Sequence, residues 1–101
     1  MASLKSPYSK EFYERNAEIY KMLANPKRLE MLTIIKDHDV TVDQLSEIMG
    51  IRKANTSQHL AILKYLRLVH VNRVGKNAYY KLTNPKIVDT IKILKDLWKE
   101  G

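Results

Sequence analysis

The stretch TVDQLSEIMGIRKANTSQHLAILKYLRLVHVNRVGKNAYYKLT, residues 41–83, decides the fold, because its pattern of apolar residues changes along its length. Its first residues match a capping box, in which the side chains of Thr41 and Gln44 satisfy each other's backbone N–H groups. An apolar stripe at helical spacing follows, formed by Val42, Leu45, Ile48 and Met49. Glycine commonly ends helices, so we expect a short helix from Thr41 that closes at Gly50.

A second helix follows after a short turn. Thr56, Leu60 and Leu63 recur at intervals of four and three residues, which places them on one helical face toward the core. The residues expected to point away from the core are Ala54, Ser57, Gln58 and Ala61. Two helices joined by so short a turn form a helix-turn-helix, whose second helix is the candidate for a DNA major groove.

The last part of the stretch has the pattern of strands. The segments LVHVNRV and NAYYKL alternate or run β-branched and aromatic, and the dipeptide GK separates them. This arrangement predicts a two-stranded hairpin whose basic tip is formed by Arg73, Lys76 and Asn77. Tyr79 and Tyr80 are neighbours on a strand and face opposite ways, so we expect one of them to lie in the core.

Further helices are expected on both sides of residues 41–83. Asn25 followed by Pro26, and Asn84 followed by Pro85, each fit an N-cap followed by proline at the first helical position. The order ααααββα is that of a mainly α winged helix-turn-helix with a small β-hairpin, in a single domain over residues 1–101. Its expected parts are a helix at 8–24, the helix-turn-helix at 41–65, the wing at 69–83 and a helix at 85–99.

The charged residues are distributed unevenly along the chain. Residues 51–83 hold seven Lys and Arg and no Asp or Glu, whereas the remainder holds 11 basic and 11 acidic residues, so the net charge of +7 arises in one third of the length. Segregated cations favour a polyanionic partner, because each phosphate neutralised by Lys or Arg releases counterions. We expect double-stranded DNA as the partner; a solvated basic face without a partner is the alternative.

The expected DNA contacts lie at the start of the second helix and at the hairpin tip. Gln58 can pair with an adenine edge, Lys53 can reach guanine and Ser57 can serve either base. Arg52 and Asn55 are better placed for the DNA backbone, and His59 is expected to be packed or to face a phosphate. The predicted contacts on this recognition helix are Arg52, Lys53, Asn55, Ser57, Gln58 and His59. The predicted contacts of the wing are Arg73, Lys76 and Asn77, which suit the adjacent minor groove.

The two terminal helices carry more apolar surface than one small core can bury. We therefore expect 8–24 and 85–99 to be dimerisation helices of a homodimer, although covering their own core is the alternative. The predicted interface residues are Phe12, Tyr13, Tyr20, Ile87, Ile91, Leu94 and Trp98.

Other classes of site lack support in the sequence. The chain has no cysteine, which removes disulfides and thiolate metal sites. Asp37, His38 and Asp39 are adjacent and cannot readily converge on one ion, so we expect neither a metal nor another cofactor. We find no pairing of nucleophile and base typical of an enzyme. No apolar run reaches the roughly 18 residues of a membrane span, and no secretory signal is visible, so we expect a cytoplasmic protein without a membrane partner.

Three segments resemble the ArsR-type winged-helix repressors: LANPKRLEMLTII, VTVDQLSEIMGIRKANTSQHLAILKYLRLV and VNRVGKNAYYKLTNP. The resemblance covers about residues 20–85 and is most specific at Pro26 with Arg28, in TSQHLAIL and in GKNAYYKL. It implies a homodimer joined through its first and last helices, which binds a palindromic operator and represses transcription until a signal relieves it. The base-reading positions of the family fall on Lys53, Ala54, Ser57 and Gln58, of which Ala54 departs from the usual serine.

The resemblance does not extend to the metal sensing for which the family is best known. The expected cysteine pair falls on Thr41 and Asp43, and the last helix retains Asp89 but has no histidine. The sequence therefore predicts a homodimeric, sequence-specific DNA-binding repressor without a metal. Two alternatives stay open, a winged-helix module that docks an acidic protein and a nonspecific nucleic-acid-coating protein. The effector and the operator stay unassigned.

Overall fold

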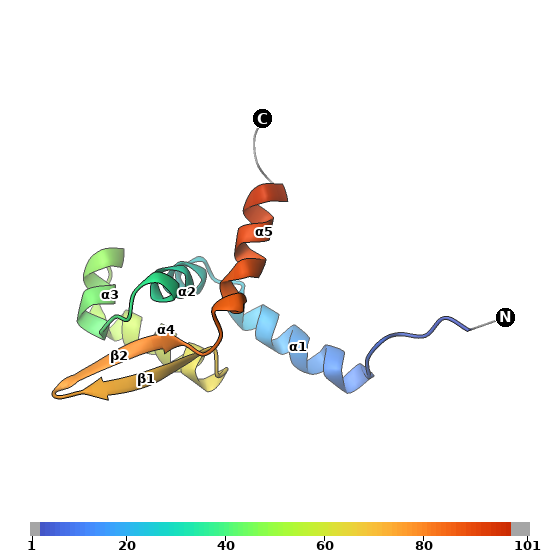
Figure 1. Cartoon of the computed structure of the whole chain (residues 1–101), viewed down its shortest axis with the longest axis horizontal. Coiled ribbons are helices and arrows are strands. Elements are labelled where there is room, and N and C mark those ends of the chain that lie inside the picture. Colours follow the sequence, from blue (N-terminus) through green and yellow to red (C-terminus); the bar gives the residue numbers. More distant parts are fainter. Residues whose placement is uncertain (1–2, 98–101) are drawn as a thin grey trace.

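The computed structural model describes residues 3–97, and residues 93–96 by their backbone alone. The described residues form five α-helices, one short 3-10 helix and one two-stranded sheet (Figure 1). In chain order the elements are α1 (Lys10–Leu23), α2 (Pro26–Asp37), α3 (Val42–Met49), α4 (Lys53–Tyr65), β1 (Val69–Val74), β2 (Asn77–Leu82), η1 (Pro85–Val88) and α5 (Asp89–Leu97). The predicted winged helix-turn-helix order is confirmed. None of the helices in residues 3–97 has the length and apolar character needed to cross a bilayer.

The predicted helix boundaries follow from the local hydrogen bonds of the caps. The Gln44 N–H donates to Thr41 Oγ1 at 3.1 Å and the Thr41 N–H donates to Gln44 Oε1 at 3.0 Å, which completes the capping box. Gly50 ends α3 in the left-handed conformation at φ 67°. Asn25 caps α2 as predicted, because its Oδ1 accepts from the backbone N–H groups of Lys27 and Arg28.

The last helix differs from the prediction at its start. Asn84 and Pro85 begin a 3-10 turn, η1, and the α-helical hydrogen-bonding pattern of α5 starts only at Asp89. A 3-10 turn is common at the N-terminal end of a helix. It carries Val88 into the core, where this side chain is only 5% exposed.

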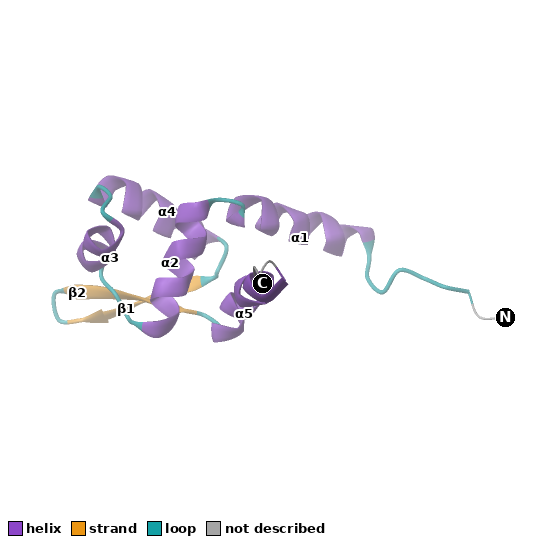
Figure 2. Ribbon diagram, turned by 90° about the horizontal axis from the view of Figure 1, so that it is seen from above, coloured by secondary structure: helices purple, strands orange, loops and turns teal. Residues whose placement is uncertain are grey.

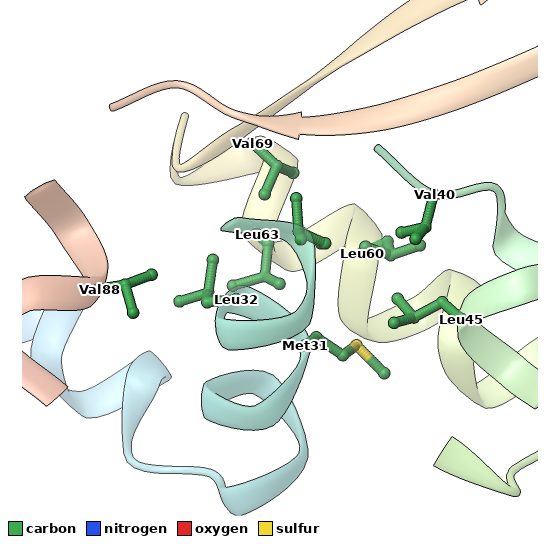
Figure 3. Packing of buried hydrophobic residues seen from close by; sticks show 9 residues of the cluster. Met31, Leu32, Val40, Leu45, Leu60, Leu63, Val69 and Val88 are labelled. Atoms are coloured by element: carbon green, nitrogen blue, oxygen red, sulfur yellow. The ribbon is translucent and has the colours of Figure 1, made fainter. Parts of the chain in front are cut away.

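The core lies between α2, α3, α4 and the hairpin (Figure 3). Its buried apolar residues are Met31, Leu32, Ile35, Val40, Leu45, Leu60, Leu63, Val69 and Val88. The predicted inward face of α4 is confirmed, since Thr56, Leu60 and Leu63 are fully buried. The predicted stripe of α3 is wrong at Ile48, which is 56% exposed. In this short helix Leu45 alone of the apolar side chains reaches full burial, and Ile48 lines an open hollow beside Val40 instead.

A backbone bridge between Val40, in the loop before α3, and Tyr80 adds to the core packing that joins the hairpin to the helices. β1 and β2 pair antiparallel from Val69 with Leu82 to Val74 with Asn77. The N–H of Tyr80 donates to the Val40 carbonyl at 2.7 Å, and Tyr80 packs against the core. One tyrosine of the neighbouring pair is therefore inward, as predicted.

The first helix stands apart from this body. Figures 1 and 2 show α1 projecting away from the compact part formed by α2, α3, α4 and the hairpin. Within the described part of the chain, no residue of α1 is buried. Most of this helix is therefore open to solvent or to a partner, whereas Leu23 at its end packs against the core.

Candidate nucleic-acid interface

The helix α4 has two faces of opposite character. Its inward face is anchored in the core, whereas its outward face is solvent-exposed. The exposed residues include Lys53, Ala54, Asn55, Ser57, Gln58 and Ala61. Five of the six predicted contact positions of the recognition helix, Arg52, Lys53, Asn55, Ser57 and Gln58, lie together at this exposed start.

A buried pair of hydroxyl groups holds α4 against α3. The Ser46 hydroxyl donates to Thr56 Oγ1 at 2.8 Å, and the Thr56 hydroxyl donates to the Arg52 carbonyl at 3.1 Å. Both side chains are buried, so leaving either one unpaired would be costly. This chain of hydrogen bonds fixes how the outward face of α4 is presented.

The start of α4 is exposed and cationic. Arg52 is the N-cap, but among residues 3–97 its side chain caps no backbone N–H. The free N–H groups of the first turn and the helix dipole favour an anion at this point. Lys53 Nζ lies 3.2 Å from Asp43 Oδ1 of α3, in a pair whose side chains are 69% and 71% exposed. A surface pair of this kind is weak, so Lys53 can exchange Asp43 for another partner.

The wing presents its predicted contacts at an exposed tip. Gly75 adopts φ 61°, as required of glycine at the first position of a two-residue hairpin loop. Arg73, Lys76 and Asn77 are exposed around this loop. Nearer the body, Lys81 Nζ lies 3.2 Å from Asp39 Oδ2 of the loop before α3, in another partly exposed pair.

His59 lies differently from the other predicted contacts. Its ring is half-buried, and its Nδ1 accepts a hydrogen bond of 3.2 Å from Nε of Arg28 in α2. Burial, followed by the cations Arg28 and Lys27, lowers the pKa of His59 below its ordinary value. Since Nδ1 accepts, the neutral ring carries its proton on Nε2, and this N–H is the donor left for another partner.

Sequence reasoning assigned no role to Tyr65, at the end of α4, and left Lys64 and Arg67 as either phosphate contacts or solvated side chains. Tyr65 is 79% exposed and continues the outward face, at seven residues from Gln58 and four from Ala61. This helical spacing could have placed Tyr65 on the outward face from the sequence alone. Lys64 and Arg67 line an open hollow with His70 and Arg73 of β1, which extends the basic surface toward the wing.

Arg67 has an unusual backbone that the sequence did not signal. It is the one non-glycine residue in 3–97 with positive φ, at 62°. The N–H of Leu68 donates to the Leu63 carbonyl at 3.0 Å and the N–H of Arg67 donates to that of Lys64 at 2.9 Å. These two bonds form a Schellman motif, in which the left-handed position is usually glycine.

Five of the seven predicted dimer residues have described side chains, three of them exposed on α1 and two lining a cavity. Phe12 is 42%, Tyr13 43% and Tyr20 65% exposed. The rings of Tyr8, which precedes α1, and Phe12 stack at 4.3 Å between centroids, so these aromatic groups form a patch at the start of α1. Ile87 and Ile91 are half-buried and line an apolar cavity of about 200 Å³ with Tyr20, Leu23 and Leu29. The side chain of Leu94 and the whole of Trp98 lie outside the described residues.

Residues 3–97 contain no cluster of three His, Asp or Glu side chains that could hold a metal ion. Asp37, His38 and Asp39 are each exposed in or beside the end of α2.

The candidate nucleic-acid interface consists of the outward face of α4, the cationic residues at both ends of this helix, and the wing tip.

Comparison with known proteins identifies the family. The profile described as "Bacterial regulatory protein, arsR family" matches residues 25–71. The transcriptional regulator KmtR of Mycobacterium tuberculosis is 36% identical over 70 residues, which are 69% of this chain and 54% of KmtR. The chain thus spans about half the length of that relative. The transcriptional repressor PagR of Bacillus anthracis is 32% identical over 85 residues, which are 83% of this chain and 85% of PagR.

A solved structure supports the same fold. The homodimeric winged helix-turn-helix DNA-binding domain of Mb0332 from Mycobacterium bovis superposes with a TM-score of 0.81, at 22% identity, over 98% of this chain and 94% of that one. The matched profile covers α2, α3, α4 and the start of β1, and it therefore includes the helix-turn-helix with the exposed face of α4. The chain is a winged helix-turn-helix regulatory protein and belongs to the ArsR family.

Proposed function

We propose that the protein is a homodimeric transcriptional repressor that binds a palindromic DNA operator. In this proposal α4 of each subunit enters the major groove, and the wing tip with Lys76 contacts the adjacent minor groove. The observation that carries the proposal is the asymmetry of α4. Thr56, Leu60 and Leu63 are fully buried, whereas the opposite side is exposed and begins with side chains able to read bases.

The chemistry of the exposed face favours base reading over simple coating. Gln58 can form a bidentate pair with adenine, and Lys53 can reach O6 or N7 of guanine once it leaves Asp43. Ala54 keeps the surface between them low, which allows the helix to approach the bases closely. The free helix start at Arg52 suits a phosphate beside these contacts.

The proposed dimer uses α1 together with η1 and α5. The exposed aromatic patch of Phe12 and Tyr13 supports this assignment, because apolar surface on a projecting helix favours a second subunit. A helix of 14 residues is also marginal in water without packing. Mb0332, which shares the fold, is described as homodimeric. The repressing action is proposed by likeness to PagR, which is named a transcriptional repressor.

A titration of labelled duplexes tests the proposal. Selection of bound sequences from a random pool should yield a palindrome that the protein prefers over random DNA by on the order of 10³. A protein that coats nucleic acid would show a steep salt slope and almost no preference. A module that docks an acidic protein would bind neither duplex, and either result would overturn the proposal.

One pair of variants then tests the assignment of α4. Gln58→Ala should reduce the preference at one base position by roughly 1–3 kcal/mol, because a bidentate contact is lost. Lys76→Ala is the matched control at the wing. It should weaken every duplex alike and reduce the salt slope by about 1, since it removes a phosphate contact. Unchanged base preference in Gln58→Ala would contradict the placement of the recognition helix.

A further inference from the structure

We propose that Arg28 is a positioning residue that couples α1 to the recognition helix and thereby sets which spacing of operator half-sites the dimer accepts. The inference rests on the proposed function, since it concerns a dimer joined through α1 that reads DNA with α4. The observation behind it is that one half-buried guanidinium hydrogen-bonds two other helices at once.

On the side of α1, Arg28 caps the end of the helix. Its Nη1 donates to the Met22 carbonyl at 2.7 Å. The last carbonyls of a helix lack partners within it, and they carry the negative end of the helix dipole. A cation bonded to Met22 therefore satisfies both requirements and fixes the direction in which α1 leaves the body.

On the side of α4, the same side chain holds His59. Its Nε donates to His59 Nδ1 at 3.2 Å, across 31 residues of sequence. The lowered pKa of His59 supports this geometry, because only the neutral ring can accept the bond from Arg28. His59 follows directly on Gln58, so the contact is made beside the start of the exposed reading face.

The backbone of Arg28 is itself held in place. Asn25 Oδ1 accepts from its N–H at 3.2 Å, and Pro26 occupies the first turn of α2. The planar guanidinium with donors on separate nitrogens can bridge two acceptors in a fixed geometry, which a lysine ammonium cannot do from one point. Arg28 is thus a rigid bracket between the end of α1, the start of α2 and the middle of α4. Figure 2 shows that only a short loop joins the end of α1 to α2.

The consequence appears in the assembled dimer. If α1 forms the interface, its angle to α4 determines the separation of the two recognition helices. Half-sites read by such a dimer lie roughly one helical turn of DNA, about 10 base pairs, or a multiple of it apart. A loose bracket would let each recognition helix reach a wider range of separations, without changing which bases each one reads.

The experiment uses full-length protein and a panel of palindromes that share the selected half-site but differ by one or two base pairs in the spacer. Wild-type protein should prefer one spacer, by about tenfold or more over its neighbours, because the helices meet the groove in register only there. Arg28→Lys keeps the charge but cannot make both bonds. It should reduce this spacer preference by at least about threefold and leave the base preference of a half-site unchanged.

Three further variants separate positioning from charge and from stability. His59→Phe removes the acceptor and keeps a ring, and it should reduce spacer preference as Arg28→Lys does. The double variant should lose little more than either single one, since both break one bridge. Lys27→Gln removes a neighbouring charge and should weaken binding to every spacer by the same factor.

The outcomes distinguish this inference from the proposed function. Wild-type spacer preference in folded, dimeric Arg28→Lys and His59→Phe would overturn the role of Arg28 and leave the repressor proposal standing. Equal weakening on every spacer would also overturn it, since a merely structural loss has that effect. Failure of the wild-type protein to bind any palindrome would overturn the proposed function, and this inference with it.

Discussion

The two helices of the helix-turn-helix end in different ways. α3 begins with the complete capping box of Thr41 and Gln44 and closes at Gly50, in the left-handed conformation that glycine tolerates best. α4 begins at Arg52, whose side chain makes no cap within residues 3–97, and closes with Arg67 in the same left-handed conformation. Both ends of α4 thus carry arginine where a helix is better stabilised by another residue.

The difference indicates what each helix is for. α3 supports the fold, and its ends have the residues that helix stability favours. α4 gives up some stability at both ends and gains a cation at each, beside the face proposed to read DNA. Such local departures from the stable choice are expected at functional sites. The following changes test this comparison, in order of expected effect.

The largest effect is expected where the two helices are joined. Thr56→Val removes the acceptor of the buried Ser46 hydroxyl and should destabilise the protein by about 1–3 kcal/mol. Denaturant unfolding at fixed protein concentration measures the change. Thr33→Val is the matched control, because Thr33 is exposed and donates only to the Leu29 carbonyl of its own helix. Equal losses in both variants would show that the buried pair contributes nothing special.

The next effect concerns the left-handed ends. Gly50→Arg should destabilise the protein by about 1 kcal/mol, because a non-glycine residue is strained at φ 67°. No steric clash adds to this loss, since no atom of residues 3–97 lies within 4 Å of an added Cβ. Arg67→Gly should stabilise by about 0.5–1 kcal/mol for the opposite reason. Thermal unfolding of both variants at one concentration checks the signs. A loss of stability in Arg67→Gly would mean that the Arg67 side chain contributes more to the fold than its backbone strain removes.

A smaller effect is expected at the start of α4. Arg52→Ser places a capping hydroxyl there and should stabilise by about 0.5 kcal/mol. The same change should weaken all duplexes and lower the salt slope by about 1, since it removes a phosphate contact. Unfolding and anisotropy titrations on the same sample measure both. DNA binding that matches the wild type would place Arg52 away from the phosphates.

The smallest effect is expected from His59, the titratable residue through which α4 is hydrogen-bonded to Arg28 of α2. Its pKa is lowered in the folded state, first by burial and then by Arg28 and Lys27. The unfolded chain therefore takes up a proton that the folded chain resists, so stability should fall as pH decreases below the ordinary value of 6.5. In His59→Gln the slope of stability against pH should be shallower between neutral pH and about 5. Superimposable profiles would argue against any role of His59 in the pH dependence.

Features that depend on neighbouring residues could be predicted from the sequence, and features that depend on distant ones could not. The box at Thr41, the turn at Gly50 and the buried face through Leu60 are set by spacing within one or two turns. The bond between Arg28 and His59 spans 31 residues and needs the packed fold. Ile48 is exposed because no other element of residues 3–97 packs over that side of α3, and the spacing of apolar residues alone does not reveal this.

The candidate site was predicted where it follows from helical geometry. The outward face with Ser57 and Gln58 was placed by spacing, and its exposure is confirmed. Contact of these residues with DNA stays a prediction. The left-handed backbone of Arg67 could not be foreseen, because the segment Leu66, Arg67 and Leu68 contains no glycine to mark the end of α4.

The absence of buried residues in α1 has a consequence for how operator binding would depend on protein concentration. In the proposed dimer, a helix of which a lone subunit buries no residue would draw ordering free energy from the second chain, so that folding of α1 and assembly would be coupled. At concentrations where most chains are monomers, the concentration of the proposed dimer, which would bind both half-sites of an operator, would grow with the square of the concentration of chains. Operator occupancy would therefore respond more steeply to changes in the synthesis or degradation of the protein than it would for a protein that binds as a monomer.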